Sequence, residues 1–231
     1  IEAALGDANA AENYRQFAMH CRKSYQALRR TPAYSLDTDR QAQLVRPLAF
    51  GLLDAEQAAF AKKRLILALE QYGWRLGTGF LSTPLILDVL SEVDIEAAYR
   101  LLENEEMPGW LFMPKNGATT VWEAWEGTAT KNGGIASLDH YSKGAVCRWL
   151  FDTMCGIRMS GENHFVIEPH PGGHFTCARA AYNSVYGQVE SGWQKVDGGW
   201  KFSLVIPANC TASLKLPGKP AVLLEAGTYT F

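Results

Sequence analysis

The spacing of the apolar residues changes once along this 231-residue chain, from a helical period to alternation, close to Gly156. Before that point apolar residues recur three and four positions apart, which is typical of one face of an amphipathic helix. After it, short runs alternate apolar and polar residues and are bounded by Gly, Pro, Asn and Asp, which is typical of strands. Helices followed by strands indicate an α+β multidomain chain. We predict a helical domain over residues 1–158 and an antiparallel β-sandwich over residues 159–231.

The helical part contains about six predicted helices. The first has an apolar face from Tyr14 to Leu28 and stops before Pro32, because a residue that precedes proline avoids helical geometry. Asp54 with Gln57 three positions later matches a capping box, and Asp94 is a second N-cap candidate. The predicted helices lie near residues 14–28, 44–53, 55–72, 84–90, 95–102 and 139–157.

Seven strands are predicted after Gly156. The turn Asp197-Gly198-Gly199 is a strong hairpin signal, because glycine adopts the positive φ that such turns require. Only residues 160–163 join the last helix to the first strand, so we expect the sandwich and the helices to pack together. The predicted strands cover residues 164–168, 175–182, 185–196, 200–206, 212–216, 221–224 and 228–231.

Composition excludes several classes of function. A formal net charge of -2 gives no concentrated basic face for nucleic acid, and no apolar run is long enough to cross a membrane. The five cysteines are an odd number without C-x-x-C spacing, so we expect small buried hydrophobic residues rather than a disulfide framework. Free cysteines and the absence of a signal segment favour a bacterial cytoplasmic protein. His170 and His174 flank Pro-Gly-Gly, which forbids a shared helical face, so we predict no metal site and no cofactor.

Two long predicted connections, residues 74–80 and 107–137, are rich in Gly, Pro, Asn and Trp, and long loops of this kind commonly carry function. The second contains residues 117–127 (GATTVWEAWEG), in which Glu123 and Glu126 lie beside Trp122 and Trp125. Indole faces pack on the apolar face of a sugar ring, and a carboxylate can accept a proton from water. The alternative interpretation of this string alone is a packed strand edge with a solvated acid.

Several segments of the chain resemble, in the same order, the C-terminal part of bacterial α-L-rhamnosidases of glycoside hydrolase family seventy-eight. The resemblance covers most of the chain from about residue 10 and implies the second half of a six-hairpin (α/α) toroid followed by a β-sandwich. The segments that carry it are residues 76–81 (LGTGFL), 106–111 (EMPGWL), 117–125 (GATTVWEAW), 137–146 (SLDHYSKGAV), 165–173 (FVIEPHPGG) and 206–212 (IPANCTA).

The resemblance also implies roles for individual residues. Inverting hydrolysis needs one acid and one base, with carboxyl groups about 6.5–9.5 Å apart, and Glu123 matches the base of the family. Glu126 is the rival carboxylate in the same loop. His140 matches a histidine that contacts the bound rhamnose, and Trp110 and Trp122 are candidate sugar contacts that are equally suited to core packing. A rhamnose-containing glycoside is the expected substrate.

The departures from the family concern what this chain lacks. The resemblance implies that the general acid lies in an N-terminal half absent from this sequence, so we expect negligible hydrolysis by these residues alone. Ser82, Asp139 and Pro47 also differ from the usual pattern of the family. The alternatives are a non-catalytic carbohydrate-binding or interaction fragment, or another toroid glycosidase or lyase.

Overall fold

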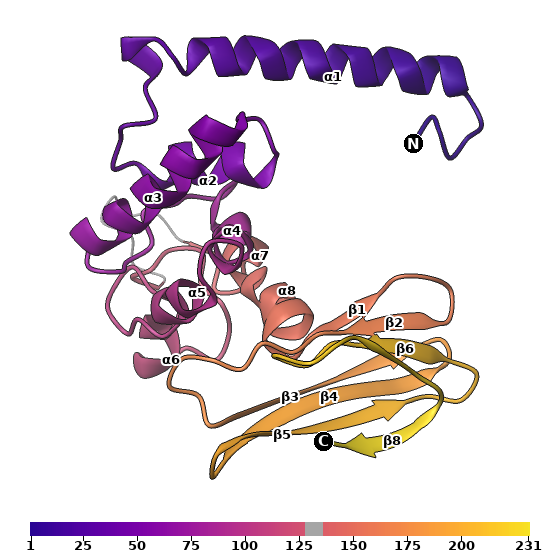
Figure 1. Cartoon of the computed structure of the whole chain (residues 1–231). Helices are drawn as coiled ribbons and strands as arrows, with labels where there is room; N and C mark the ends of the chain where they lie inside the picture. The colour runs from indigo at the N-terminus through magenta and orange to yellow at the C-terminus, as the bar shows by residue number, and fades with distance from the viewer. Residues whose placement is uncertain (128–135) are drawn as a thin grey trace. The chain divides into compact units, whose positions relative to one another are not determined.

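The structure, a computed structural model, describes residues 1–127 and 136–231 (Figure 1). The predicted loop 107–137 therefore includes eight residues, 128–135, that lie outside the described residues. Contacts between residues divide the chain into two compact units, Ile1–Val89 and Leu90–Phe231.

The first unit is helical, as predicted. The long α1 (Ala8–Leu28) ends ahead of a short 3-10 turn, η1 (Pro32–Tyr34). It is followed by α2 (Gln41–Ala49), which contains Pro47, and by α3 (Ala55–Gln71). The turn η2 (Thr83–Leu85) leads into α4 (Ile86–Ser91), which spans the division between the units. The predicted helix near residues 44–53 is thus shorter at its C-terminal end than expected.

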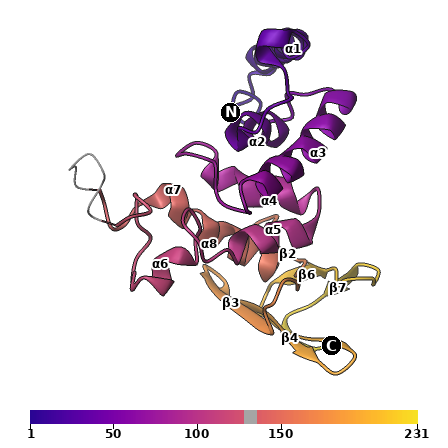
Figure 2. The same ribbon diagram turned by 90° about the vertical axis from the view of Figure 1, so that its left-hand side faces the viewer.

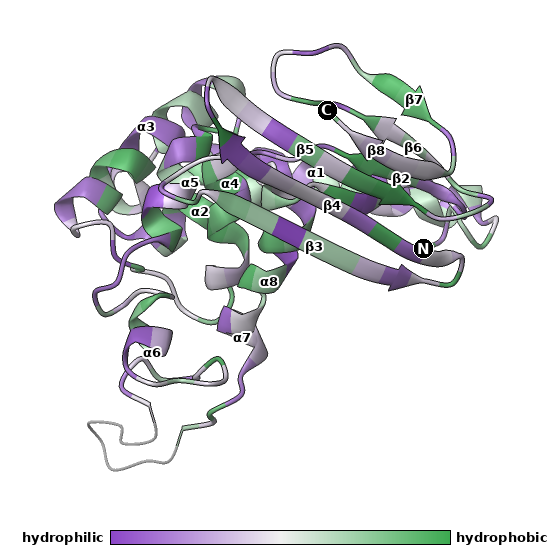
Figure 3. Cartoon of the chain, turned by 90° about the horizontal axis from the view of Figure 1, so that it is seen from below, coloured by the Kyte–Doolittle hydropathy of each residue, from purple (hydrophilic) through white to green (hydrophobic). Residues whose placement is uncertain are grey.

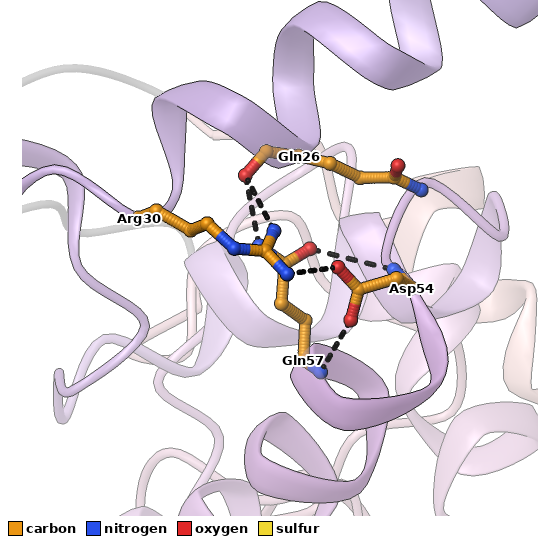
Figure 4. A network of polar contacts seen from close by, with 4 residues as sticks. All are labelled: Gln26, Arg30, Asp54 and Gln57. Atoms are coloured by element: carbon orange, nitrogen blue, oxygen red, sulfur yellow. Dashed lines mark hydrogen bonds and ion pairs between the residues drawn. The ribbon is translucent and has the colours of Figure 1, made fainter.

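The capping box predicted at the start of α3 is confirmed. The Asp54 carboxylate accepts a hydrogen bond from the Gln57 N–H at 2.9 Å, and the Gln57 side chain accepts one from the Asp54 N–H. The same two residues hold the end of α1, since Gln57 Nε2 donates to the Gln26 carbonyl and Arg30 pairs with Asp54 at 2.8 Å (Figure 4). One polar network therefore both caps the start of α3 and joins α3 to the end of α1.

Helix α1 is mostly exposed, and residues such as Tyr25 and Gln26 near its end are half-buried. All 21 of its residues are described, and none of them is buried. Its predicted apolar face is present, but Tyr14 and Phe17 are 65% and 68% exposed. The core of the unit lies instead between α2 and α3, where buried apolar side chains interdigitate: Leu44, Val45, Ala61, Leu65, Ala68 and Leu69.

In the second unit the helices are shorter. They are α5 (Ile95–Leu102), capped by Asp94 as predicted, α6 (Phe112–Lys115), α7 (Tyr141–Gly144), α8 (Val146–Trp149) and the π-helical turn η3 (Leu150–Met154). The single helix predicted over residues 139–157 is therefore wrong in detail. It is divided into three pieces, and its last residue begins a strand. Gly156 ends the helical stretch because its φ of +75° is left-handed and its backbone packs directly against Glu168.

The β-sandwich is confirmed, and it consists of two four-stranded sheets (Figures 1 and 2). One has the order β1-β2-β6-β7 and the other β3-β4-β5-β8. Every pair is antiparallel except β2–β6, which is parallel, with Ile167 beside Leu214. The strands are β1 (Ile157–Met159), β2 (His164–Ile167), β3 (Cys177–Ser184), β4 (Gly187–Val196), β5 (Gly199–Ile206), β6 (Thr211–Leu214), β7 (Val222–Leu224) and β8 (Gly227–Thr230).

The seven predicted strands match β2 to β8, and β1 is the one that sequence reasoning missed. The hairpin predicted at Asp197-Gly198-Gly199 joins β4 to β5, with Gly198 at a φ of +85°. Hydrophobic and hydrophilic residues are interleaved along the strands (Figure 3), and Phe202, Leu204 and Ile206 are all buried, as their alternation predicted.

The helices of the second unit pack on the sandwich. Trp193 Nε1 donates to the Met154 carbonyl at 2.8 Å, and the Ser191 hydroxyl donates to the Cys155 carbonyl at 2.6 Å. Tyr99 of α5 is fully buried, meets Trp149 edge-on at 5.2 Å and donates its hydroxyl hydrogen to the His170 carbonyl. Residues of α5, η3 and the sandwich therefore share one core.

All five cysteines are free thiols. The expectation that they are buried is correct for Cys155 and Cys210 and wrong for Cys21, Cys147 and Cys177, which are exposed. Among the described residues, no helix has the length and the apolar character needed to span a membrane.

Candidate active site

Two loop segments of the second unit, residues 120–123 and 137–140, are held side by side by backbone hydrogen bonds. The Glu123 N–H donates to the Ser137 carbonyl at 2.9 Å, and the His140 N–H donates to the Val121 carbonyl at 2.8 Å. The Thr120 hydroxyl adds a bond to the Leu138 carbonyl. This pairing brings Glu123 and His140, which are 17 positions apart in the sequence, onto the same pair of segments.

Glu123 has an exposed side chain whose orientation is fixed at one oxygen. Its Oε2 accepts a hydrogen bond from the Ser137 N–H at 2.8 Å. The residue is thus tied to Ser137 through both backbone and side chain. These bonds orient the Glu123 carboxylate, and a carboxylate with a fixed orientation is suited to accepting a proton from a bound water molecule.

His140 is the N-cap of α7, rather than a residue inside the helix as predicted. Its Nδ1 accepts a hydrogen bond from the Ser142 N–H at 3.3 Å and lies 3.1 Å from the Ser142 hydroxyl oxygen. Because Nδ1 accepts, the neutral ring carries its proton on Nε2, which makes that nitrogen a hydrogen-bond donor. A donor of this kind suits a hydroxyl oxygen.

The tryptophans around this loop differ in exposure. Trp110 is only 6% exposed, and its Nε1 donates to the Lys143 carbonyl at 3.0 Å, so it closes part of the core. Trp122 is half-buried, and Gly127 lies beside its ring, since a Cβ added there would be 3.5 Å from it. The ring of Trp125 lies 4.0 Å from the ammonium group of Lys143, measured to the ring centroid.

Lys143 was not identified from the sequence. It is 8% exposed, and its Nζ donates to the Glu123 carbonyl. Burial lowers the pKa of Lys143 to about 8, while the carboxylates of Glu126 and Glu123 act in the opposite direction. The only signal in the sequence is its position three residues after His140, because nothing local distinguishes it from a surface lysine.

Within residues 1–127 and 136–231, no group of three or more His, Cys, Asp or Glu side chains is arranged to hold a metal ion. The two histidines that flank Pro-Gly-Gly contact different carboxylates. His170 Nε2 lies 4.0 Å from Glu168, and His174 Nδ1 lies 2.8 Å from Glu103. They lie in the turn that leads into the sandwich, where these contacts anchor the chain.

Two protein-family models together match nearly the whole chain. The sequence model of the bacterial α-L-rhamnosidase six-hairpin glycosidase domain matches residues 1–154, and that of the bacterial α-L-rhamnosidase C-terminal domain matches residues 158–230. The chain belongs to the bacterial α-L-rhamnosidase family. The resemblance drawn from the sequence motifs is thereby confirmed.

Individual α-L-rhamnosidases are similar over nearly the whole chain. The protein of Streptomyces avermitilis is 33% identical over 214 residues, which are 90% of this chain and 21% of that protein. The crystal structure of the Aspergillus terreus enzyme superposes on this chain with a TM-score of 0.88 and 31% sequence identity. The superposition covers 100% of this chain and 28% of the A. terreus chain. The structure of the S. avermitilis enzyme complexed with L-rhamnose superposes with a TM-score of 0.84 and 29% sequence identity. That superposition covers 99% of this chain and 24% of the S. avermitilis chain.

This rhamnosidase-family chain therefore spans between 21% and 28% of the length of these relatives. The six-hairpin glycosidase and C-terminal β domains of the family account for its order of helices followed by sheets. Glu123 and His140 both fall within the part that matches the glycosidase domain.

Proposed function

We propose that this chain supplies the general-base side of an inverting α-L-rhamnosidase site, with Glu123 as the base. The observation that carries the proposal is an exposed carboxylate held at 2.8 Å by the Ser137 N–H, within the glycosidase domain of a rhamnosidase-family chain. In this mechanism Glu123 removes a proton from a water molecule as that water attacks the anomeric carbon. One oxygen orients the carboxylate and the other accepts the proton.

The same proposal assigns the sugar contacts. His140 donates from Nε2 to a rhamnose hydroxyl, since its Nδ1 already accepts from the Ser142 N–H. Trp122 and Trp110 are the proposed aromatic contacts, and half-buried Trp122 offers more ring surface than Trp110, which is 6% exposed. An S. avermitilis relative whose structure is complexed with L-rhamnose supports this choice of sugar.

The general acid is proposed to come from residues outside this chain. Hydrolysis with inversion needs a second carboxyl group to protonate the leaving oxygen. Two observations support a missing segment: the chain spans about a fifth of its curated relatives, and the apolar face of α1 is exposed. We propose that the helical domain predicted over residues 1–158 is part of the toroid and that residues 159–231 form the sandwich, with the first sandwich strand, β1, beginning two residues before that boundary, at Ile157. The chain by itself is expected to give no turnover of an aryl α-L-rhamnoside.

The test compares Glu123→Gln with Glu126→Gln in the full gene product that contains this chain. Both carboxylates are exposed and lie in one loop, so Glu126→Gln is a matched control. Loss of a general base predicts a fall in kcat of about 10²–10⁴-fold for Glu123→Gln, with Glu126→Gln within a few-fold of the parent. The reverse ranking would remove Glu123 from the mechanism. Rhamnose binding without turnover in the unmodified protein would favour a carbohydrate-binding role.

The role of His140 is tested with two substitutions that separate sugar contact from helix capping. His140→Ala removes both, whereas His140→Asn keeps an acceptor for the Ser142 N–H. A sugar contact predicts a raised KM in both variants, with thermal stability restored in His140→Asn. Full recovery of KM in the asparagine variant would show that the histidine acts only as a cap.

A further inference from the structure

Lys143 connects three parts of the second unit. Its Nζ donates to the Glu123 carbonyl and lies over the Trp125 ring, while its own carbonyl accepts from Trp110 Nε1. It is the third residue of α7, the helix whose N-cap is His140. One side chain therefore joins the segment that carries Glu123 to the helix that His140 begins.

The burial of this lysine is unusual within the molecule. Among the described residues, it is the one buried side chain of the Asp, Glu, Lys or Arg types, and the other buried polar residues are Gln, Ser and Thr. Taking an ammonium group out of water is costly unless hydrogen bonds and nearby charges compensate. Here the compensation comes from the Glu123 carbonyl, the Trp125 face and the carboxylates of Glu123 and Glu126.

These contacts fix the backbone of Glu123 on both sides. Its N–H is held by the Ser137 carbonyl, its carbonyl by Lys143, and its carboxylate by the Ser137 N–H. Without Lys143, the Glu123 carbonyl would lose this hydrogen bond. A misplacement of a reacting group by about 1 Å costs about 10²-fold in rate.

We propose that Lys143 is the positioning residue for the Glu123 carboxylate, holding the loop of residues 120–127 against α7. The inference rests on the proposed function of Glu123 and deepens it, because no contact of Lys143 with substrate is required. The lysine acts through the Glu123 carbonyl and the Trp125 ring.

The first test is Lys143→Met in the full gene product, with Lys115→Met as the matched control. Lys115 lies in the same unit and pairs with Glu105 at 2.6 Å on the surface. Lys143→Met is expected to lower kcat by at least about 30-fold with KM within about threefold, because the base moves while the sugar contacts stay. Lys143→Arg, which keeps a cationic donor, recovers part of that loss. A kcat within threefold of the parent in a folded Lys143→Met protein would overturn the proposal.

A second measurement requires no substitution of Lys143. Tryptophan emission of the unmodified chain is followed from pH 6.5 to 9.5 and compared with Trp125→Phe. An ammonium group 4.0 Å from the ring centroid with a pKa of about 8 predicts an emission change centred near pH 8 that is missing from Trp125→Phe. Identical titrations of the two proteins would contradict the position of Lys143.

Failure of this inference and failure of the proposed function give different results. If Glu123→Gln retains activity, the base assignment itself is wrong. If Glu123→Gln is inactive and Lys143→Met retains its kcat, Glu123 remains the base and only the positioning role of Lys143 is excluded.

Discussion

Helices α1 and α5 have similar sequence signals and opposite environments. Each is N-capped by an aspartate, Asp7 or Asp94, and each carries an apolar face. The 21 residues of α1, all described, include none that is buried, whereas five of the eight residues of α5 are buried. Periodicity predicts that a helix forms and which face is apolar. Whether that face is buried depends on a partner element, which the helix's own sequence does not describe.

The largest expected difference between the two helices is in the stability lost when one tyrosine ring is removed from each. Tyr99→Ala in α5 deletes a fully buried ring that contacts Trp149 and should lower the free energy of unfolding by about 3–5 kcal/mol. Tyr14→Ala in α1 deletes a ring that is 65% exposed and should change it by less than about 0.5 kcal/mol. Urea denaturation of this chain, followed by circular dichroism, measures both. Equal losses would show that α1 is buried in solution.

A smaller effect is expected where α5 meets the turn before the sandwich. A Cβ on Gly172 would lie 2.5 Å from the Tyr99 ring, so Gly172→Ala should cost about 1–3 kcal/mol through overpacking. Gly199→Ala is the control in the same unit, because nothing lies within 4 Å of a Cβ there. The difference between the urea midpoints of the two variants measures the cost of overpacking against the Tyr99 ring. A neutral Gly172→Ala would mean that the turn is not held against α5.

The smallest expected difference concerns the two N-caps. Asp94→Ala removes the acceptor for the Glu96 N–H and should cost about 1 kcal/mol, since α5 unfolds together with the core. Asp7→Ala removes the acceptor for the Ala10 N–H, and it should reduce helix content at the N-terminal end of α1 while the main unfolding transition stays within about 0.5 kcal/mol. Far-UV circular dichroism and thermal unfolding distinguish these outcomes. A shift of the main transition by Asp7→Ala would show that α1 unfolds cooperatively with the core.

Much of the fold was predictable because its signals are local. The capping box at Asp54, the hairpin at Gly198 and the alternation of Phe202, Leu204 and Ile206 each lie within a few residues. Strand β1 and the division of the helix predicted over residues 139–157 were not predictable. The start of β1 at Ile157 depends on the approach of the Gly156 backbone to Glu168, twelve positions away, and no local pattern records that contact.

The candidate site divides in the same way. Glu123 and His140 were identifiable through motifs that resemble a known family, and their roles stay predictions. Lys143 was not identifiable, because its contacts with Glu123 and Trp125 join residues 18 to 20 positions apart across a loop. A lysine inside the helix predicted over residues 139–157 has the sequence signature of a solvated residue, and only the structure shows that it is buried.

The parallel pairing of β2 with β6 has a consequence for the order of events during synthesis. Thr211 lies 47 positions after its neighbour His164, whereas β3, β4 and β5 are joined by tight hairpins. Closing so long a chain segment carries an entropic cost that the hairpins avoid. The strands β3, β4 and β5 can therefore pair on a growing polypeptide as each is made, while one edge of β2 must wait until β6, residues 211–214, has been synthesised.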